Sequence, residues 1–579
     1  MKFINKPETT KEKLFLFLLI LICIFSFALS LSFSLEFVIK LAEKVIHRTL
    51  RDHTKWINIL SGVVHIPFLT CLILIFRNFT LLGNKTIELS KNETSNFKTF
   101  ISKKETKLLF VFVLVFFVFA TRQLISADIL FQDDISRNHD GDRNWISFGR
   151  YISEFLSILI HSTIKLTDVA PLTQYISIFF MAVSIVILVY CIDPESKHPY
   201  LTMIPLTFLY LSPYFQDCFL FRFDSPYMVL AVLFPIIPFI YKDNLYSFSY
   251  SSFISLILCC MCYQAGSSVY IILVIYFTYN KIVKGEKLSE IGKFVLCSII
   301  AYAASLLIYQ LLFSANTTRS DADYYYSTKL TLSALIPNLK YYSSIIFTQT
   351  GGLLTKACIF ICIALSAFIS IKNSKNNKIL TLIVFILALI LAFILSTGPY
   401  IIFETTMLTG RTFMGINCLI AILLYTSFSY LSSEKYLKIA IIPAVLCIYS
   451  SIAYLYTLGN CLSEQKNYNE FRYQMIYDDL NDLVDPTQNI YISFEHNVGF
   501  CNAFEIALKK YPHLKNTVPC MPSSGSIWNT DYSYRFNFMF DDDESPDSNL
   551  PLLKSSYYHD IYGADNHFRI DLHNHLSLD

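Results

Sequence analysis

Apolar runs of about 20 residues, the length at which a helix crosses the hydrocarbon core of a bilayer, recur along this sequence. Backbone amides in lipid must bond within their own segment, so each run is expected to be a helix. Hydrophobic residues make up 54% of the 579 residues and charged residues only 16%, a composition too apolar for a soluble protein. The sequence therefore predicts an all-α polytopic membrane protein with about thirteen transmembrane helices. The expected spans are 14–39, 56–76, 107–126, 172–192, 199–215, 226–241, 249–263, 266–280, 293–314, 351–371, 379–398, 412–432 and 439–458.

Short loops rich in lysine orient these helices, because such loops stay on the cytoplasmic side. Loops of this kind lie at 281–287, 372–378 and 435–438. Alternating outward from them places residues 127–171 and the C-terminal tail on the opposite, outer face. The basic segment 40–55 conflicts with this alternation. It is either an interfacial helix or a sign that the early spans are miscounted.

The same pattern divides the chain into three regions. Residues 1–106 are expected to form an N-terminal extension with about two transmembrane helices. Residues 107–458 form the transmembrane core, whose outer loop covers 127–171. The composition then becomes that of a soluble protein, so 459–579 is expected to form a small α/β or α+β domain on the outer face. Its expected elements are helices at 465–484 and 502–510 and a strand at 489–494.

Three motifs that are common in soluble enzymes are missing from the sequence. It has no Walker loop, no GxGxxG after a strand and no GxSxG elbow, and its net charge of +2 does not favour a nucleic-acid partner. Most of the fifteen cysteines lie in apolar runs, where they behave as small hydrophobes. Cys501 and Cys520 either form a disulfide or remain free thiols. His559, His567, His573 and His575 could suggest a metal, but we expect a frayed polar tail.

The densest group of polar chemistry lies between residues 131 and 151, with four aspartates and three arginines. Asp133 and Asp134 are adjacent carboxylates that could serve as a general base, as a metal site or as part of a solvated loop. Nearby arginines suit bidentate phosphate binding, and Trp145 and Tyr151 offer flat faces for a sugar ring. The following segment, 152–166, is too short to span and is expected to lie in the membrane interface.

Further polar residues fall on the same predicted face. Arg222 and Asp224 are either a phosphate-binding pair or an ordinary pair at the membrane surface. Gln264 lies where two spans meet, and it either lines a cavity or packs in the core. Arg411 brings a further arginine to this face.

The order of these residues resembles the serotype-converting O-antigen glucosyltransferases of enteric bacteria and their phages, the Gtr type II family. The resemblance covers about residues 107–460 and is specific in order and spacing. It rests on Asp133, Asp134, Arg137, Gly141, Trp145, Gly149, Arg150, Tyr151 and Glu154, on Asp168, Pro171 and Gln174, on Arg222, Asp224 and Ser225, and on Tyr263, Gln264 and Ala265.

The resemblance implies a GT-C-like glycosyltransferase of the bacterial inner membrane, with its active face in the periplasm. The implied donor is undecaprenyl-phosphate-glucose, and the implied acceptor is a sugar of the lipid-linked O-antigen of lipopolysaccharide. A glucosyl-lipid synthase and a small flippase would be functional partners. No cofactor and no metal are predicted, although a divalent cation at Asp133 and Asp134 is an alternative.

Elementary chemistry adds roles to this resemblance. A sugar hydroxyl needs a positioned base, and we expect Asp133 or Asp134 to act as one. A lipid phosphate is a good leaving group that needs only charge stabilisation, which arginines supply. Arg150 and Arg222 are the preferred phosphate ligands, with Arg143 and Arg411 in reserve. Acceptor-binding or orienting roles fall to Arg137, Trp145, Tyr151, Glu154, Asp224 and Gln264.

Two other functions fit a polytopic protein that binds a lipid phosphate. A flippase or transporter of a lipid-linked sugar would more often show internal repeats and charges deep within its spans. An O-antigen polymerase would more typically have its principal loop late in the chain. Here the charge is concentrated in an early outer loop, which favours a glycosyltransferase.

Overall fold

The computed structural model describes most of the chain beyond residue 89. The described residues are 90–195, 198–314, 327–405, 409–429, 431, 434–484, 490–518, 520–521, 539–540 and 550–574. The chain divides into two compact units, Met1–Asn92 and Glu93–Asp579. The spans predicted at 14–39 and 56–76 and the basic segment 40–55 lie in the first unit, outside the described residues.

Eight helices of the described part are long and apolar enough to cross a membrane. Each coincides with a predicted span, so these eight predictions are confirmed as helices. They are α5 (Lys104–Ser126), α8 (Leu172–Ile192), α13 (Leu245–Cys262), η3 (Gln264–Gly266) with α14 (Ser267–Val283), α15 (Leu288–Tyr309) leading into η4 (Gln310–Ser314), α17 (Leu353–Asn373), α18 (Lys378–Leu395), and α20 (Glu434–Ala440) with α21 (Ile442–Asn481).

Three further predicted spans, 199–215, 226–241 and 412–432, are shorter apolar helices, so the described residues do not reproduce the full count. Proline explains the first two, since it removes a backbone donor and clashes with the preceding turn. Pro205 and Pro213 divide the first of these segments, and Pro238 lies in the 3₁₀ end of the second. The pieces are α9 (Pro199–Leu206), α10 (Phe208–Leu211), α11 (Pro213–Leu220), α12 (Ser225–Leu233), η2 (Phe234–Tyr241) and α19 (Met414–Thr426).

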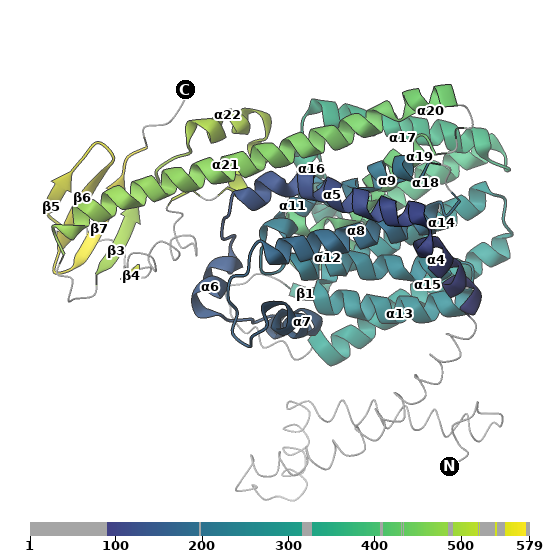
Figure 1. Ribbon diagram of the computed structural model, residues 1–579, viewed down its shortest axis with the longest axis horizontal. Coiled ribbons are helices and arrows are strands. Elements are labelled where there is room, and N and C mark those ends of the chain that lie inside the picture. Colours follow the sequence, from purple (N-terminus) through teal and green to yellow (C-terminus); the bar gives the residue numbers. More distant parts are fainter. Residues whose placement is uncertain are drawn as a thin grey trace, which may run out of the picture. The chain divides into compact units, whose positions relative to one another are not determined.

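The helices pack with α5 against both α8 and α21, and with α19 against α14 and α17 (Figure 1). The short helices α12 and α19 are buried almost throughout. In contrast, Val115 and Phe119 of α5 and Ile383 and Leu387 of α18 are exposed. Rows of exposed large apolar side chains are unusual in soluble proteins. Together with the length of the helices, they indicate a membrane protein.

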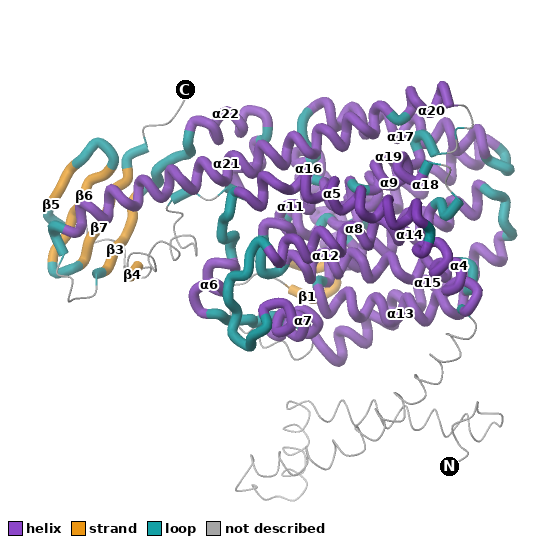
Figure 2. Tube along the Cα trace, viewed as in Figure 1, coloured by secondary structure: helices purple, strands orange, loops and turns teal. Residues whose placement is uncertain are grey.

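Strands are few among the described residues (Figure 2). A five-stranded sheet has the order β4-β3-β7-β6-β5, with β3 parallel to β4 and β7 and the other pairs antiparallel. Its inner face packs on Tyr473, Ile476 and Leu480 of α21. The sheet consists of β3 (Tyr491–Glu495), β4 (Met539–Phe540), β5 (Leu552–Ser555), β6 (His559–Ala564) and β7 (His567–Leu572), and β1 (Ser327–Leu330) pairs separately with β2 (Phe403–Thr405).

The expected strand and helix after residue 484 are confirmed as β3 and as α22 (Asn502–Lys510). The helix expected at 465–484 is instead the second half of α21, a helix of 40 residues that runs unbroken from the last span to the sheet. Cys501 and Cys520 are free thiols. The prediction of a frayed tail is wrong for the described histidines, because His559 and His567 lie in strands. Buried His559 contacts Asp479 at 3.0 Å.

The remaining helices of the described part are shorter than the spans. They are α4 (Lys91–Ser102), α6 (Asp133–Asp140), η1 (Ile146–Phe148), α7 (Tyr151–His161), η5 (Leu332–Ala334), α16 (Leu335–Gln349), η6 (Gly398–Ile402), η7 (Gly410–Thr412) and η8 (Pro512–Asn516).

The contact between α5 and α21 yields a test of the packing. A Cβ added at Gly459 would lie 2.6 Å from the carbonyl carbon and oxygen of Gln123, whereas one added at Gly292 of α15 would meet nothing within 4 Å. We expect Gly459→Ala to lower stability by about 1–3 kcal/mol through overpacking. Gly292→Ala, the matched control, should be neutral or slightly stabilising because alanine favours the helix. Melting temperatures in detergent measure both, and equal values would contradict the close approach of α5 to α21.

Candidate active site

The stretch from residue 131 to 151, expected as a loop, is largely helical. It contains α6 and η1, and α7 follows directly. Gln132, which precedes α6, has φ 49° and ψ −114°, an unusual backbone conformation for a residue with a side chain. Gly141 ends α6 in the left-handed region with φ 69°. A Cβ at position 141 would also lie 3.1 Å from the carbonyl oxygen of Leu166, so both space and conformation favour glycine there.

Asp134 is fully buried and holds α6 against the segment that precedes α12. One carboxylate oxygen accepts hydrogen bonds from the backbone N–H groups of Phe131 (3.2 Å) and Arg222 (2.9 Å). The other oxygen accepts one from the N–H of Phe223 at 3.3 Å. Burial raises the pKa of Asp134 to about 7, although Arg137 and the two N–H groups at 222 and 223 act to lower it. The Asp134 carboxylate is therefore a structural anchor of this site.

Asp133 differs from its neighbour because its side chain is exposed. The Asp133 carboxylate acts on two arginines, the buried Arg137 and the half-buried Arg411. Burial lowers the pKa of Arg137, and Asp133 opposes that effect. Burial also acts to lower the pKa of Arg411, but nearby anionic groups that include Asp133 outweigh it, so that pKa is raised. The exposed carboxylate of the pair thus lies close to the positive charges of the site.

A buried network joins α6 to the start of α12. The Arg137 guanidinium is ion-paired with Asp224, and the Trp145 indole N–H donates to the same carboxylate. The Arg137 guanidinium carbon lies 4.4 Å from the centre of the Trp145 ring. Trp145 is fully buried and also packs edge-on against Tyr227. The structure thus places Trp145 and Asp224 in the protein interior.

Glu154 fixes the loop before α7. One of its oxygens accepts from the Arg143 Nε at 3.1 Å, and the other accepts from the backbone N–H of Trp145 at 3.1 Å. Arg143 is therefore already neutralised by the Glu154 carboxylate.

Tyr151, at the start of α7, packs edge-on against Phe313 with ring centres 5.4 Å apart.

Arg222 is ion-paired on both sides. Its guanidinium contacts Asp128 at 2.7 Å and Asp168 at 2.5 Å. Lys466 of α21 donates to the backbone carbonyl of Asp128 at 2.7 Å, which ties the long helix to this cluster. Two carboxylates around one guanidinium leave no net positive charge at Arg222.

Arg150 is held by aromatic rings instead of by carboxylates. Its guanidinium carbon lies 4.9 Å from the centre of the Phe148 ring and 4.6 Å from that of Tyr263. The described residues place no carboxylate within ion-pair distance of Arg150, and its Nε is buried without a hydrogen-bond partner. Gln264 supports this wall, since its amide donates to the Phe148 carbonyl at 2.9 Å and to the Tyr309 hydroxyl at 2.6 Å. Arg150 therefore carries a positive charge that no carboxylate of the described residues neutralises.

Arg411 lies in η7, where its guanidinium is 5.0 Å from the centre of the Phe221 ring. Asp217 of α11, which is half-buried, is its acidic neighbour. Burial raises the pKa of Asp217 to about 6, against the lowering effect of Arg411. Asp217 was not predicted as a site residue, because its only signal in the sequence is a lone carboxylate in an apolar stretch.

A polar cavity of about 250 Å³ opens beside Arg411 and Gln132. Residues far apart in the sequence line it, among them Tyr341 and Gln349 of α16, Tyr454 of α21 and the C-terminal His513 and Thr517. None of these five was predicted as a site residue. Sequence reasoning missed them because their separation along the chain hides their proximity.

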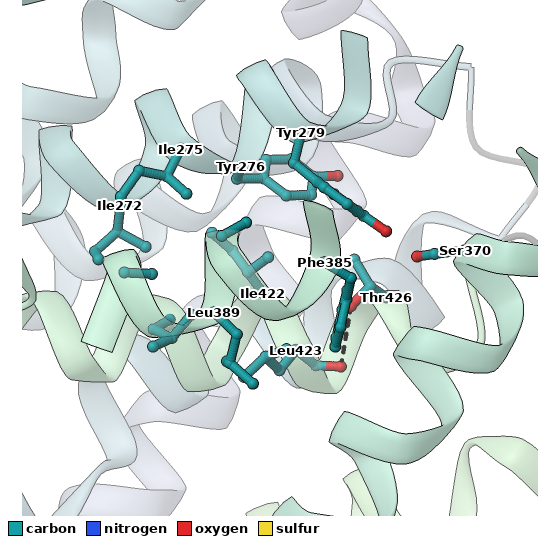
Figure 3. Close-up of a pocket in the computed structure, with 13 residues that line it drawn as sticks. Ile272, Ile275, Tyr276, Tyr279, Ser370, Phe385, Leu389, Ile422, Leu423 and Thr426 are labelled. Carbon is teal, nitrogen blue, oxygen red and sulfur yellow. Dashed lines mark hydrogen bonds between the residues drawn. The ribbon is translucent and has the colours of Figure 1, made fainter. Parts of the chain in front are cut away.

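A second cavity, of about 60 Å³, lies among α14, α17, α18 and α19 (Figure 3). Ile272 and Tyr276 of α14 line it together with Leu389 of α18 and Ile422 of α19. No charged side chain is among its lining residues. It therefore offers no base and no phosphate ligand. The described residues also contain no group of three or more His, Cys, Asp or Glu that could hold a metal ion.

Comparison with known proteins relates this site to a family. The model of the family described as "Glucosyl transferase GtrII" matches residues 123–423, just over half of the chain. An uncharacterized 55.3 kDa protein in the gtrB 5′ region of Salmonella phage P22 is 24% identical over 206 residues, which cover 34% of this chain and 41% of that protein. The match thus spans less than half the length of that relative. No solved structure matches the chain.

The anchor at Asp134 predicts a pH dependence of stability. Its folded pKa of about 7 lies above the ordinary 3.8, so the folded chain binds this proton more tightly than the unfolded chain. The contribution of this carboxyl to stability is thus largest below about pH 4 and is lost as the pH rises through about 7. Asp134→Asn should remove this part of the slope, and should also lower stability by about 1–3 kcal/mol because an amide NH₂ cannot accept the backbone bonds.

Melting temperatures in detergent between about pH 5 and 8 measure this slope. Asp133→Asn, the matched control on the exposed neighbour, should keep the wild-type slope and stability. Parallel curves for the wild type and Asp134→Asn would show that Asp134 is not the anchor.

Proposed function

The chain belongs to the GtrII glucosyl transferase family, and we propose that it transfers a glucosyl residue from undecaprenyl-phosphate-glucose to a sugar of the lipid-linked O-antigen. The reaction takes place on the periplasmic face of the bacterial inner membrane. A glucosyl-lipid synthase and a small flippase supply the donor to that face. Family membership and the apolar helices support a membrane glycosyltransferase, and the charges around α6 support the assignment of roles.

The observation that carries the proposal is the unpaired charge of Arg150. Arg137, Arg143 and Arg222 each have a carboxylate partner, whereas Arg150 is held between Phe148 and Tyr263 without one among the described residues. A guanidinium suits bidentate binding of a phosphate, and aromatic walls keep water away from the contact. Arg150 is therefore the principal ligand of the donor phosphate. Arg411 acts on the same Tyr263 ring electrostatically and assists Arg150.

Asp133 is the general base in this proposal. Its carboxylate is exposed and can reach a substrate, while Asp134 is buried and occupied by three backbone N–H groups. Asp134 positions Asp133 by fixing the first turn of α6. The unusual backbone at Gln132 is a second element of that positioning, because it sets the direction in which the helix begins.

The reaction then proceeds as a single displacement. Asp133 accepts the proton of the acceptor hydroxyl as its oxygen forms a bond to the anomeric carbon of glucose. The bond from that carbon to the phosphate oxygen breaks, and the lipid phosphate leaves with the electron pair. No general acid is required, because Arg150 and Arg411 stabilise the charge that develops on the phosphate. Attack from the opposite side inverts the anomeric configuration.

The other arginines hold the frame of the site. Arg137 joins α6 to Asp224, and Arg222 joins the segment before α12 to Asp128 and Asp168. Binding a phosphate at Arg222 would require it to leave two carboxylates. We therefore assign Arg222 a positioning role in place of the phosphate-binding role expected from its sequence motif.

Replacing the base tests this proposal directly. Asp133→Asn should reduce glucose transfer by about 10²- to 10⁴-fold, the usual contribution of a general base, without changing the melting temperature. Asp140→Asn, on the exposed end of the same helix, is the matched control and should keep full activity. The assay uses membranes with the full-length chain, labelled undecaprenyl-phosphate-glucose and lipid-linked O-antigen from a host that lacks the enzyme. Full activity of Asp133→Asn would refute the assignment.

Substitution of Arg150 tests its proposed role as the phosphate ligand. Arg150→Gln should lower transfer by about 10- to 100-fold, because a charge-assisted hydrogen bond contributes about 1.5–3 kcal/mol. Arg150→Lys should recover part of this loss, since it restores the charge without the bidentate geometry. Arg122→Gln, at an exposed position of α5, serves as the control. Unchanged dependence on donor concentration in Arg150→Gln would contradict donor binding at this residue.

A further inference from the structure

The polar cavity beside Arg411 is completed by residues outside the region that the family model matches. Gln132, Asp217 and Arg411 fall within residues 123–423, whereas Tyr454 and His513 come after it. One part of the chain that the family model matches and one part that it does not match thus line the same cavity.

The C-terminal wall of the cavity is well defined. The His513 Nε2 lies 3.1 Å from the Tyr454 hydroxyl, and the two rings are nearly parallel with centres 5.6 Å apart. The rings of Tyr511 and Tyr454 pack edge to face with their centres 5.0 Å apart. The Nδ1 of His513 is buried and has no hydrogen-bond partner among the described residues. Burial lowers the pKa of His513 to about 4, aided by Lys356, so the imidazole is neutral at neutral pH.

The chemistry of the lining suits a neutral polyhydroxylated ligand. Gln132, Gln349, Thr517 and the neutral His513 donate or accept hydrogen bonds, and the aromatic rings of Tyr341 and Phe221 supply apolar faces. The two charged side chains of the lining, Arg411 and Asp217, attract each other. At about 250 Å³ the cavity lies just below the usual range of about 300–1,000 Å³ for small-molecule pockets, a size that suits a single sugar ring.

The position of the cavity distinguishes the acceptor from the donor. Gln132 lines it, and Asp133, the next residue, carries the proposed base. The group that loses a proton to that base is the acceptor hydroxyl. Arg150, the proposed principal ligand of the donor phosphate, does not line the cavity. Arg411, which assists Arg150 in the proposal, lies in the cavity wall, so the cavity adjoins the donor phosphate on that side.

We propose that this cavity binds the acceptor sugar, and that His513 and Tyr454 are specificity-determining residues that select it. The inference rests on the proposed function and deepens it. The family-matched part of the chain supplies the base and the phosphate ligands, while the segment from η8 to residue 517 reads the hydroxyl pattern of the acceptor.

The test separates acceptor binding from donor binding. Membranes containing the full-length chain are assayed with labelled undecaprenyl-phosphate-glucose and with lipid-linked O-antigen from a host that lacks the enzyme, each varied in turn. His513→Ala and Tyr454→Phe should each raise the apparent KM for the acceptor by about tenfold or more, which corresponds to the loss of one hydrogen bond of about 1.4 kcal/mol. The apparent KM for the donor should stay within about twofold of the wild type.

The controls keep the test decisive. His496→Ala changes an exposed histidine that does not line the cavity, and both KM values should be unchanged. Tyr454→Phe removes one hydroxyl and guards against a folding defect in His513→Ala, and melting temperatures are recorded for each. An unchanged acceptor KM in Tyr454→Phe and His513→Ala, or a rise in the donor KM alone, would overturn the inference. If the wild type itself transfers no glucose, the proposed function is wrong. If the wild type transfers glucose and both variants do so with an unchanged acceptor KM, only the inference about the cavity is wrong.

Discussion

Three backbone N–H groups donate to the buried carboxylate of Asp134, and the geometry of the candidate active site around α6 depends on this contact. The contact sets the first turn of α6 against the segment 221–223, which in turn carries Arg222 and leads to Asp224. A carboxylate with a pKa near 7 is costly to ionise in this position, yet it gives backbone groups at the end of a membrane helix partners that water cannot supply. Holding Asp134 in the interior leaves the side chain of Asp133 directed outward. Two adjacent residues of one type thus differ: Asp134 has a structural role, and Asp133 is left free for the chemical role proposed for it.

The arginines of the site divide in the same way. Buried charges are tolerated when they are paired, and the frame of the site consists of such pairs: Arg137 with Asp224, Arg143 with Glu154, and Arg222 with Asp128 and Asp168. A paired guanidinium is already neutralised and attracts an anion weakly. Arg150 is stabilised by the rings of Phe148 and Tyr263, which allow it to keep its charge. The choice of partner therefore separates arginines that hold the fold from an arginine that can bind a phosphate.

Hydrophobic run length was sufficient to predict the eight long helices, because a span is a local property of the sequence. It failed at 199–215 and 226–241, where prolines divide an apolar run without changing its hydropathy. The polar residues near 131–151 and at 222, 224 and 264 were recognised from their order, and the structure brings them to one region. Their pairing could not be predicted, since whether Arg150 or Arg222 has a carboxylate neighbour depends on contacts such as Arg222 with Asp128, 94 residues away. The cavity wall formed by Tyr454 and His513 could not be predicted for the same reason, because these residues are far in sequence from Gln132, which also lines the cavity.

The unbroken helix α21 connects these observations. It carries Tyr454 in the wall of the polar cavity, Lys466 against Asp128, and further along the apolar residues that support the C-terminal sheet. A continuous helix transmits position with little flexibility, because each turn is fixed by its own hydrogen bonds. Its packing against α5, with Gly459 in close contact with Gln123, places it at the helix that leads into α6. The wall that is proposed to select the acceptor and the helix that carries the proposed base are thus joined through one rigid element. Such a coupling keeps the C-terminal wall and the proposed base at a fixed distance from each other.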